Sequence, residues 1–279
     1  MEEKMNITET PASYSRTVEG QVTIDAPVEA VWKAITEAEE LKRWFPVDAK
    51  VEPGQGGEMT FYWKDYYVWR FHIKDWEPDK HLRLGYDHDR DFHAEKEDKI
   101  ISDNPRELVV DYRIEAEGGK TTLRLVHSGF GTGSDWDQEY NGVKRGWTSE
   151  LLMLKFYLEE HPGEDRVVNW SRKAMNTSVE EIWDKFMSFG GIDPDTLKEG
   201  GSYSYDTDTG EHYEGKVISV YSPTDFIATV DNLNNALIRV KIDHPEEPTL
   251  DVLLESYGLE EEKADAFKQY WDKILSQKF

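Results

Sequence analysis

The sequence predicts an α+β protein in which a curved antiparallel sheet wrapped around a long helix occurs twice in tandem. Three observations lead to this prediction. Several segments of the first half alternate between apolar and polar residues, which is the pattern of strands with one buried face. Thr121–Glu160 starts as such a strand, breaks at Gly129 and Gly131, and continues as a long amphipathic helix. The same order of signals then returns after Asp165.

A strand and two short helices open the first half. Thr17–Ile24 alternates as a strand, and Pro27 stands at the first position of the next helix, where its missing N–H costs nothing. Apolar residues recur there at helical spacing: Val28, Val31, Trp32 and Ile35. A second short helix is expected over Ala38–Trp44, followed by a turn over residues 52–57 (EPGQGG).

Four further strands each have one apolar face and one charged face. They are Tyr67–Asp75, His81–Tyr86, Leu108–Glu115 and Thr121–His127. The charged faces carry a basic stripe of His72, Lys74, Arg83, Arg113 and Arg124. We expect this stripe to pair with Asp111 and neighbouring acids across the strands. The long helix fits the apolar faces with a stripe of its own, formed by Trp147, Leu151, Leu154 and Leu158.

The second half repeats the helix signal of the first. VEEIW at residues 179–183 resembles VEAVW at residues 28–32. Thr177 and Glu180 have the spacing of a capping box, which favours a helix start at this point.

The late strand and the closing helix also return. Ala236–Ile242 is expected to correspond to Thr121–His127, and a helix from about Glu260 repeats the apolar stripe with Trp271 and Leu275. We interpret the second half as a shorter, diverged copy of the first, which lacks the His-Ser-Gly-Phe-Gly loop. The expected organisation is a polar lead-in over 1–16, a first domain over 17–163 and a second domain over 164–279.

The charge of the chain is strongly negative, with 57 acidic and 33 basic residues and a formal net charge of −24. Such a surface repels phosphate backbones and anionic lipids, so we expect no binding to nucleic acid or to membrane surfaces. The acidity fits either an ordinary solvated surface or a host with a salty interior, where screening relieves self-repulsion.

The chain has no cysteine, which excludes disulfides, thiol nucleophiles and cysteine-bound zinc. Its first residues lack an apolar signal core, and no stretch approaches the roughly 20 apolar residues of a membrane span. We therefore expect a cytoplasmic protein.

Several motifs together resemble the START-like, or SRPBCC, superfamily, whose helix-grip fold is shared with birch-pollen-allergen proteins. They are IDAPVEAVWKAITEAEELKRWF, GQGGEMTF, and TTLRLVHSGFG followed by GWTSELLMLKFYLEE. Within it the chain is most similar to bacterial proteins resembling the C-terminal domain of the heat-shock-protein-90 ATPase activator. The resemblance covers residues 17–160 well and 166–277 faintly. It implies an apolar cavity between sheet and helix, in proteins that include lipid carriers, polyketide binders, cyclases, hydrolase-like variants and co-chaperones.

The candidate ligand-binding residues lie in the first domain. His127 is interpreted either as a polar anchor or general base at the mouth of a cavity, or as a half-buried histidine bonded to backbone. The aromatic residues either line a pocket or fill the core. The set consists of Trp44, Phe45, Tyr62, Trp69, Phe71, Tyr112, His127, Trp136 and Trp147.

Other motifs point to no cofactor and no metal. The run from His88 to His93 contains two histidines, yet it is more typical of a charged hairpin tip than of a metal site. Asp206–Gly210 resembles the start of a calcium loop, but Val217 stands where the twelfth-position Glu belongs. No phosphate loop, nucleophile elbow, dinucleotide fingerprint or zinc-protease motif occurs.

The leading hypothesis is a non-enzymatic protein that binds a small apolar or aromatic ligand between the sheet and the long helix of the first domain. The second domain would be a structural partner. Two alternatives stay open, namely a co-chaperone-like module that binds a protein partner, and a cyclase- or hydrolase-type enzyme that uses His127.

Overall fold

The computed structural model describes residues 8–9, 15–63, 67–87, 92–93, 107–189, 197–207, 210–243 and 246–279. The chain divides into two compact units, Met1–Gly163 and Glu164–Phe279. The run from His88 to His93, which contains two histidines, lies outside the residues whose side chains are described.

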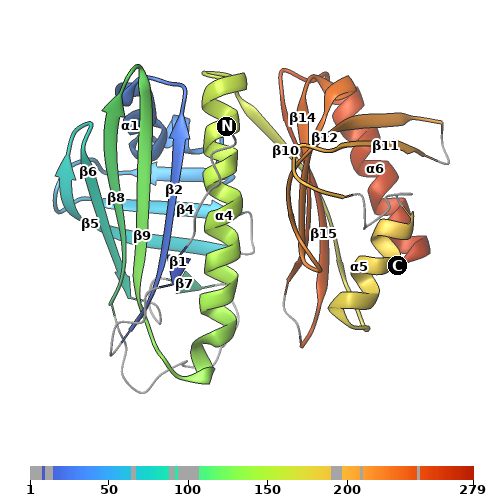
Figure 1. The fold of residues 1–279 in the computed structure, drawn as a ribbon, viewed down its shortest axis with the longest axis horizontal. Coiled ribbons are helices and arrows are strands. Elements are labelled where there is room, and N and C mark those ends of the chain that lie inside the picture. The colour runs from blue at the N-terminus through green and yellow to red at the C-terminus, as the bar shows by residue number, and fades with distance from the viewer. Residues whose placement is uncertain are drawn as a thin grey trace. The chain divides into compact units, whose positions relative to one another are not determined.

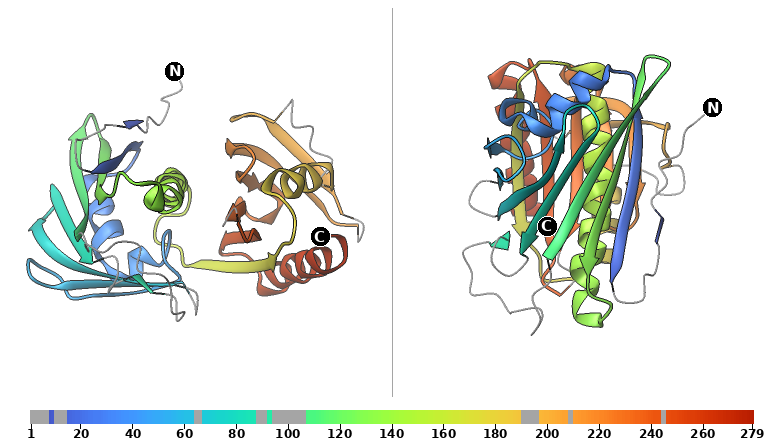
Figure 2. Two further views of the ribbon diagram at one scale, coloured as in Figure 1. Left: turned by 90° about the horizontal axis from the view of Figure 1, so that it is seen from below. Right: turned by 90° about the vertical axis from the view of Figure 1, so that its left-hand side faces the viewer.

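The first unit is an antiparallel sheet curved around one long helix (Figures 1 and 2). Its sheet has the order β1-β2-β9-β8-β6-β5-β4-β3, and β7 pairs with β5. The strands are β1 (Thr8–Glu9), β2 (Arg16–Ile24), β3 (Asp48–Val51), β4 (Glu58–Trp63), β5 (Tyr67–Glu77), β6 (His81–Asp87), β7 (Phe92–His93), β8 (Glu107–Glu117) and β9 (Lys120–Phe130). The helices are α1 (Val28–Thr36), α2 (Ala38–Leu41), the 3₁₀ turn η1 (Ser134–Trp136) and α4 (Asp137–Glu160).

The apolar stripe of α4 is buried, as its spacing predicts. Trp147, Leu151, Leu154 and Leu158 are at most 6% exposed. Each fully buried leucine contributes about 1.5–3 kcal/mol, so this stripe fixes the helix against the sheet.

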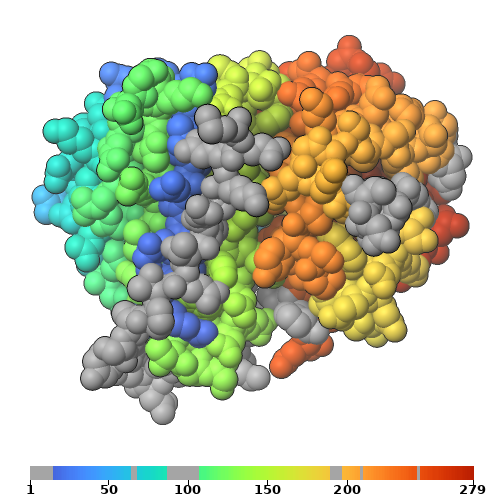
Figure 3. Space-filling view, in the orientation of Figure 1, coloured from blue at the N-terminus to red at the C-terminus, as the bar shows by residue number. Residues whose placement is uncertain are grey.

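The outer face of the sheet is polar, and each member of the basic stripe has an acidic partner there. The pairs are His72–Glu58, Lys74–Glu107, Arg83–Asp75, Arg113–Asp111 and Arg124–Glu115. Four of these pairs join different strands, as expected, whereas Arg113 and Asp111 lie two residues apart on β8. These pairs are largely exposed, so each contributes about 0–1 kcal/mol. The space-filling view shows the strands β8 and β9 in green on this side of the unit (Figure 3).

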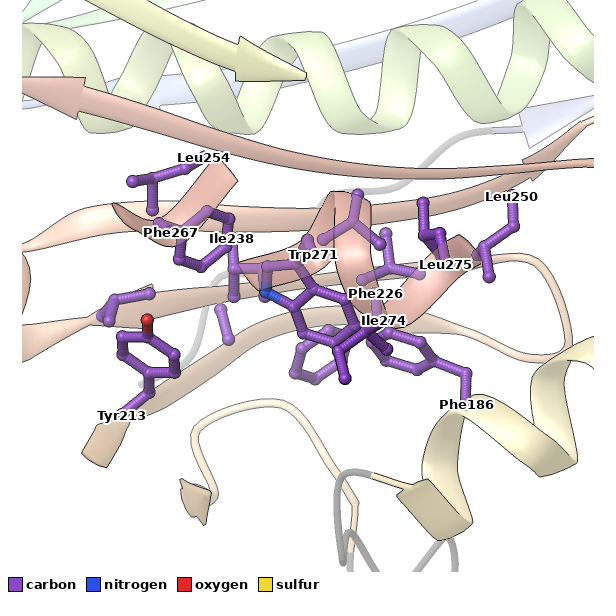
Figure 4. Close-up of a cluster of buried hydrophobic side chains, with 14 of the residues drawn as sticks. Phe186, Tyr213, Phe226, Ile238, Leu250, Leu254, Phe267, Trp271, Ile274 and Leu275 are labelled. Atoms are coloured by element: carbon purple, nitrogen blue, oxygen red, sulfur yellow. The ribbon is translucent and has the colours of Figure 1, made fainter. Parts of the chain in front are cut away.

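The second unit is also an antiparallel sheet with helices, in the strand order β10-β15-β14-β13-β12-β11. Its elements are β10 (Arg166–Ala174), α5 (Val179–Phe189), β11 (Ser202–Asp206), β12 (His212–Tyr221), β13 (Asp225–Val230), η2 (Asp231–Leu233), β14 (Ala236–Asp243), β15 (Thr249–Tyr257) and α6 (Glu261–Lys278). Trp271 of α6 lies at the centre of its core, near Phe186 and Phe226 (Figure 4).

Two predictions about the second unit were wrong in detail. Ala236–Ile242 belongs to β14, whereas the strand that precedes the closing helix and pairs with the first strand is β15. The sequence shows no alternation over β15, because both faces of this strand are buried. Its buried residues include the acidic Asp251 and Glu255. The cap of α5 is Ser178, whose Oγ accepts the N–H of Glu181 at 3.2 Å; the helix begins one residue later than the Thr177 capping box implied.

A buried ion group explains how β15 tolerates an acid. Glu255 is 1% exposed and accepts hydrogen bonds of 2.8 Å from both Arg166 and Arg239. Burial alone would raise the pKa of Glu255, but the two guanidinium groups lower it below its ordinary value. The carboxylate therefore stays charged inside the unit.

No helix within the described ranges is long and apolar enough to cross a membrane.

Candidate functional site

His127 lies inside the first unit and is held by two side chains. It is fully buried on β9. The indole N–H of Trp147 donates to its Nδ1 at 2.9 Å, and its Nε2 lies 3.1 Å from the Tyr86 hydroxyl oxygen. An indole can only donate, so Nδ1 carries no proton and the neutral ring carries its proton on Nε2. His127 therefore donates to Tyr86, and each of its ring nitrogens is bonded to a side chain.

Aromatic rings from β5, β6, β9 and α4 lie around His127. Its ring centroid lies 4.7 Å from Phe130, 5.7 Å from Tyr86 and 6.1 Å from Trp147. We define the aromatic cluster as Phe45, Phe61, Trp63, Trp69, Phe71, Tyr86, Tyr112, His127, Phe130 and Trp147. At such spacings neighbouring rings are in contact, so a bound molecule must displace at least one of them.

Most of the predicted site residues belong to this cluster or border it. Phe45, Trp69, Phe71, Tyr112, His127 and Trp147 are members. Trp44 stacks on Phe45 at 5.1 Å and donates its N–H to the carbonyl of Ala34, while Trp136 packs on Phe130 at 6.3 Å.

Tyr62 lies elsewhere. Met59 and Phe61 of β4 are buried, so the alternation of the strand puts Tyr62 on the opposite face, with the Lys50 ammonium 5.5 Å from its ring. Trp63, which the sequence reasoning missed, lies in the cluster in place of the predicted Tyr62. It is the one half-buried ring of the cluster, and it packs on Phe45 at 5.2 Å.

The sequence reasoning also missed Tyr86, although its alternation with Leu82 and Leu84 placed it on the buried face. Burial, with the negative charge of Glu139, raises the pKa of Tyr86 well above its ordinary value. Burial, with Glu150, likewise raises the pKa of Tyr112. Both hydroxyls therefore keep their protons at physiological pH.

The His-Ser-Gly-Phe-Gly loop requires both of its glycines. Gly129 has a φ of +106°, and a Cβ there would lie 2.7 Å from the carbonyl oxygen of Glu107. A Cβ on Gly131 would lie 2.3 Å from the indole of Trp136. The loop thus lets Trp136 close over Phe130 at the end of β9.

The second unit encloses a small cavity between its sheet and α6. Its volume is about 20 Å³, which leaves room for about one water molecule. Its lining is almost entirely aromatic and aliphatic: Phe186, Tyr203, Tyr205, Tyr213, Phe226, Val230, Ile238, Phe267 and Trp271. The hydroxyls of Tyr205 and Tyr270 are hydrogen-bonded to each other beside it. A cavity of this size does not hold an aromatic ligand.

Within the described residues, no three His, Asp or Glu side chains converge as metal ligands. Asp206 ends β11 and pairs with His212 at the start of β12, so the calcium-like segment lies between two paired strands.

Comparison with known proteins gives a family match within the first unit. Residues 25–159 match the family described as "Activator of Hsp90 ATPase homolog 1-like protein". No curated protein matches the chain significantly.

Solved structures of similar fold include three that illustrate the range. CalU16 from Micromonospora echinospora is 22% identical over 56% of this chain and 85% of its own, with a TM-score of 0.40. The Aha1 dimer from Colwellia psychrerythraea is 19% identical over 53% of this chain and 98% of its own, with a TM-score of 0.42. DynU16, a putative protein in the dynemicin biosynthetic locus, is 15% identical over 93% of this chain and 95% of its own, with a TM-score of 0.41.

Proposed function

We propose, from the premise that residues 25–159 belong to the family of Activator of Hsp90 ATPase homolog 1-like proteins, that the first unit binds a small apolar or aromatic molecule between its sheet and α4. One observation carries the proposal. Polar atoms of Tyr86, His127 and Trp147 meet inside an otherwise apolar, aromatic interior. A mostly apolar site with a few convergent polar groups is the usual composition of a small-molecule pocket.

Binding requires a ring to move, and Trp63 is the best candidate. Its partners in the cluster are Phe45, Phe61 and Trp69, and its position at the end of β4 leaves it half-buried. A flat ligand that takes the place of the Trp63 indole would keep contact with the rings behind it. The cost is the burial lost by one half-buried side chain, about 1–2 kcal/mol.

Replacement of Trp63 tests this mechanism directly. Trp63→Ala should bind the tricyclic hydrocarbon fluorene about tenfold more tightly than the unchanged protein, because the indole no longer has to be displaced. Trp76→Ala is the matched control, since Trp76 is also half-buried in the first unit but packs on Trp32 at 5.1 Å, outside the cluster. Calorimetric titration that finds no binding to either the unchanged protein or Trp63→Ala would remove the proposal.

The second unit is proposed to be a diverged copy of the first, with domain limits at 17–163 and 164–279. In both sheets an early strand, β2 in the first unit and β10 in the second, lies beside the last one, and the strands beyond the last one follow in descending order. In both units a long helix follows the last strand. Among the described residues of this copy no aromatic cluster surrounds a histidine, so we assign it a structural role.

A protein-interaction role is the second candidate, and the description of the family favours it. A chain with a net charge of −24 would select a basic surface on such a partner. Stimulation of a heat-shock ATPase by the purified protein would support this role, and loss of the effect in high salt would identify the charge contribution.

The geometry speaks against a role of His127 as general base. Its Nδ1 lone pair already accepts the Trp147 N–H, and its Nε2 carries the proton. The ring can take up another proton only after the Trp147 bond breaks. We therefore propose a binding function without catalysis.

A further inference from the structure

Among the residues that the structure describes, the Tyr86 hydroxyl is a buried donor without an acceptor. Tyr86 is 1% exposed, and its oxygen accepts the Nε2–H of His127. His127 cannot accept in return, because Trp147 fixes its tautomer. Among the described residues no other acceptor lies within hydrogen-bond distance of this hydroxyl. A buried donor in this state costs about 1–3 kcal/mol.

The chain of bonds has a direction, and that direction determines what can complete it. Trp147 donates to His127, His127 donates to Tyr86, and Tyr86 has one proton left to donate. Every link is uncharged. Phe71 lies 5.2 Å from the Tyr86 ring, and Trp69, at the same distance, has an indole N–H that can only donate. None of the described residues supplies an acceptor at the end of this chain, and a molecule that enters the aromatic cluster would supply one.

We infer that the ligand of the first unit carries an uncharged acceptor oxygen, as in an aromatic ketone or quinone, which takes the hydrogen bond of the Tyr86 hydroxyl. The inference rests on the proposed ligand-binding function and adds the chemical class of the ligand. Glu139 exerts its negative charge on Tyr86, so a carboxylate or phosphate ligand is disfavoured at the same place.

Two probes of the same shape test the inference in the full-length protein. Fluorene and 9-fluorenone share one tricyclic skeleton and differ by a carbonyl oxygen. We expect 9-fluorenone to bind about five- to tenfold more tightly than fluorene, since one neutral hydrogen bond forms and one buried donor is satisfied. In Tyr86→Phe this preference should disappear.

Tyr140→Phe is the matched control. Tyr140 is 6% exposed, and its hydroxyl donates to the carbonyl oxygen of Thr17 at 3.1 Å, so its proton already has an acceptor. This variant should keep the preference for 9-fluorenone. A second readout needs no variant: the infrared carbonyl stretch of bound 9-fluorenone should lie below its value in an apolar solvent.

The outcomes separate the inference from the function on which it rests. If both probes bind and the preference survives in Tyr86→Phe, or if the carbonyl stretch is unshifted, the inference is wrong and the binding function stands. If neither probe binds, the proposed function fails and the inference fails with it.

Discussion

The bond between Trp147 and His127 predicts that these two side chains are energetically coupled. His127→Leu leaves the indole N–H of Trp147 without an acceptor in a site that is 3% exposed, and it removes the bond to Tyr86. The first loss costs about 1–3 kcal/mol and the second about 0.5–1.5 kcal/mol. Leucine fills a similar volume, so the free energy of unfolding of the first unit should fall by about 2–4 kcal/mol.

The reciprocal change has a similar cost. Trp147→Phe leaves Nδ1 of His127 without a donor, about 1–3 kcal/mol, and shortens a buried ring, about 1 kcal/mol more. In the double variant neither group is left without a partner, because both have been removed. The combined loss should therefore be at least about 1 kcal/mol smaller than the sum of the single losses.

Scanning calorimetry measures this cycle, because each kcal/mol shifts the Tm of a unit of this size by about 2–4 °C. Trp44→Phe combined with His127→Leu is the control cycle. The Trp44 N–H donates to the Ala34 carbonyl at 2.8 Å and not to His127, so these losses should add within about 0.5 kcal/mol. Equal coupling in the two cycles would show that the Trp147–His127 bond is wrongly assigned.

Three further predictions concern the rest of the chain. Glu255→Gln should destabilise the second unit by about 3–5 kcal/mol, since two buried arginines lose their shared anion. The control Glu260→Gln, at an exposed ion pair, should cost under about 1 kcal/mol. Equal losses of the two variants in urea unfolding would contradict the buried triad. The pKa of Glu255 is lowered in the folded unit, so the stability that its charge contributes is present above the unfolded pKa of about 4.3 and is lost as the pH falls through the lower folded pKa. If the difference in unfolding free energy between Glu255→Gln and the unchanged protein already vanishes at pH 6, this sign is wrong. Gly131→Ala should expel the Trp136 indole and shift tryptophan emission to the red, and an unchanged spectrum would show that the loop adapts instead.

Most of the first unit could be predicted from its sequence, because one face of each predicted strand is exposed to solvent. Alternation is visible only where buried and exposed positions differ in polarity. That condition holds for β5, β6, β8 and β9, and their predicted faces agree with the structure. It fails for β15, where Asp251 and Glu255 occupy buried positions because arginines neutralise them. A strand with two buried faces and interior charges gives no period-2 signal.

The site was harder to predict than the fold, since it depends on which polar atoms meet. The sequence put His127 on the inward face of its strand, and alternation also put Tyr86 inward. Their contact depends on the register of β6, β8 and β9, which pairs Tyr86 with Leu108 and His127 with Val110. Register over three strands is set by the whole sheet and is not encoded near either residue.

The second unit supplies an internal comparison that bears on why the first unit contains a buried histidine. Its last strand and closing helix have the same order, and Trp271 of α6 stacks on Phe186 at 5.5 Å in a core whose strand β15 contributes Leu250, Val252 and Leu254. A sheet of this order with a long helix thus packs with aliphatic residues on the inward face of that strand. Hydrogen-bonded polar side chains on this inward face give little more stability than apolar side chains of the same shape. Under the proposed function, the directed bond of His127 to Tyr86 leaves one hydroxyl proton for a ligand that accepts the last hydrogen bond of the chain.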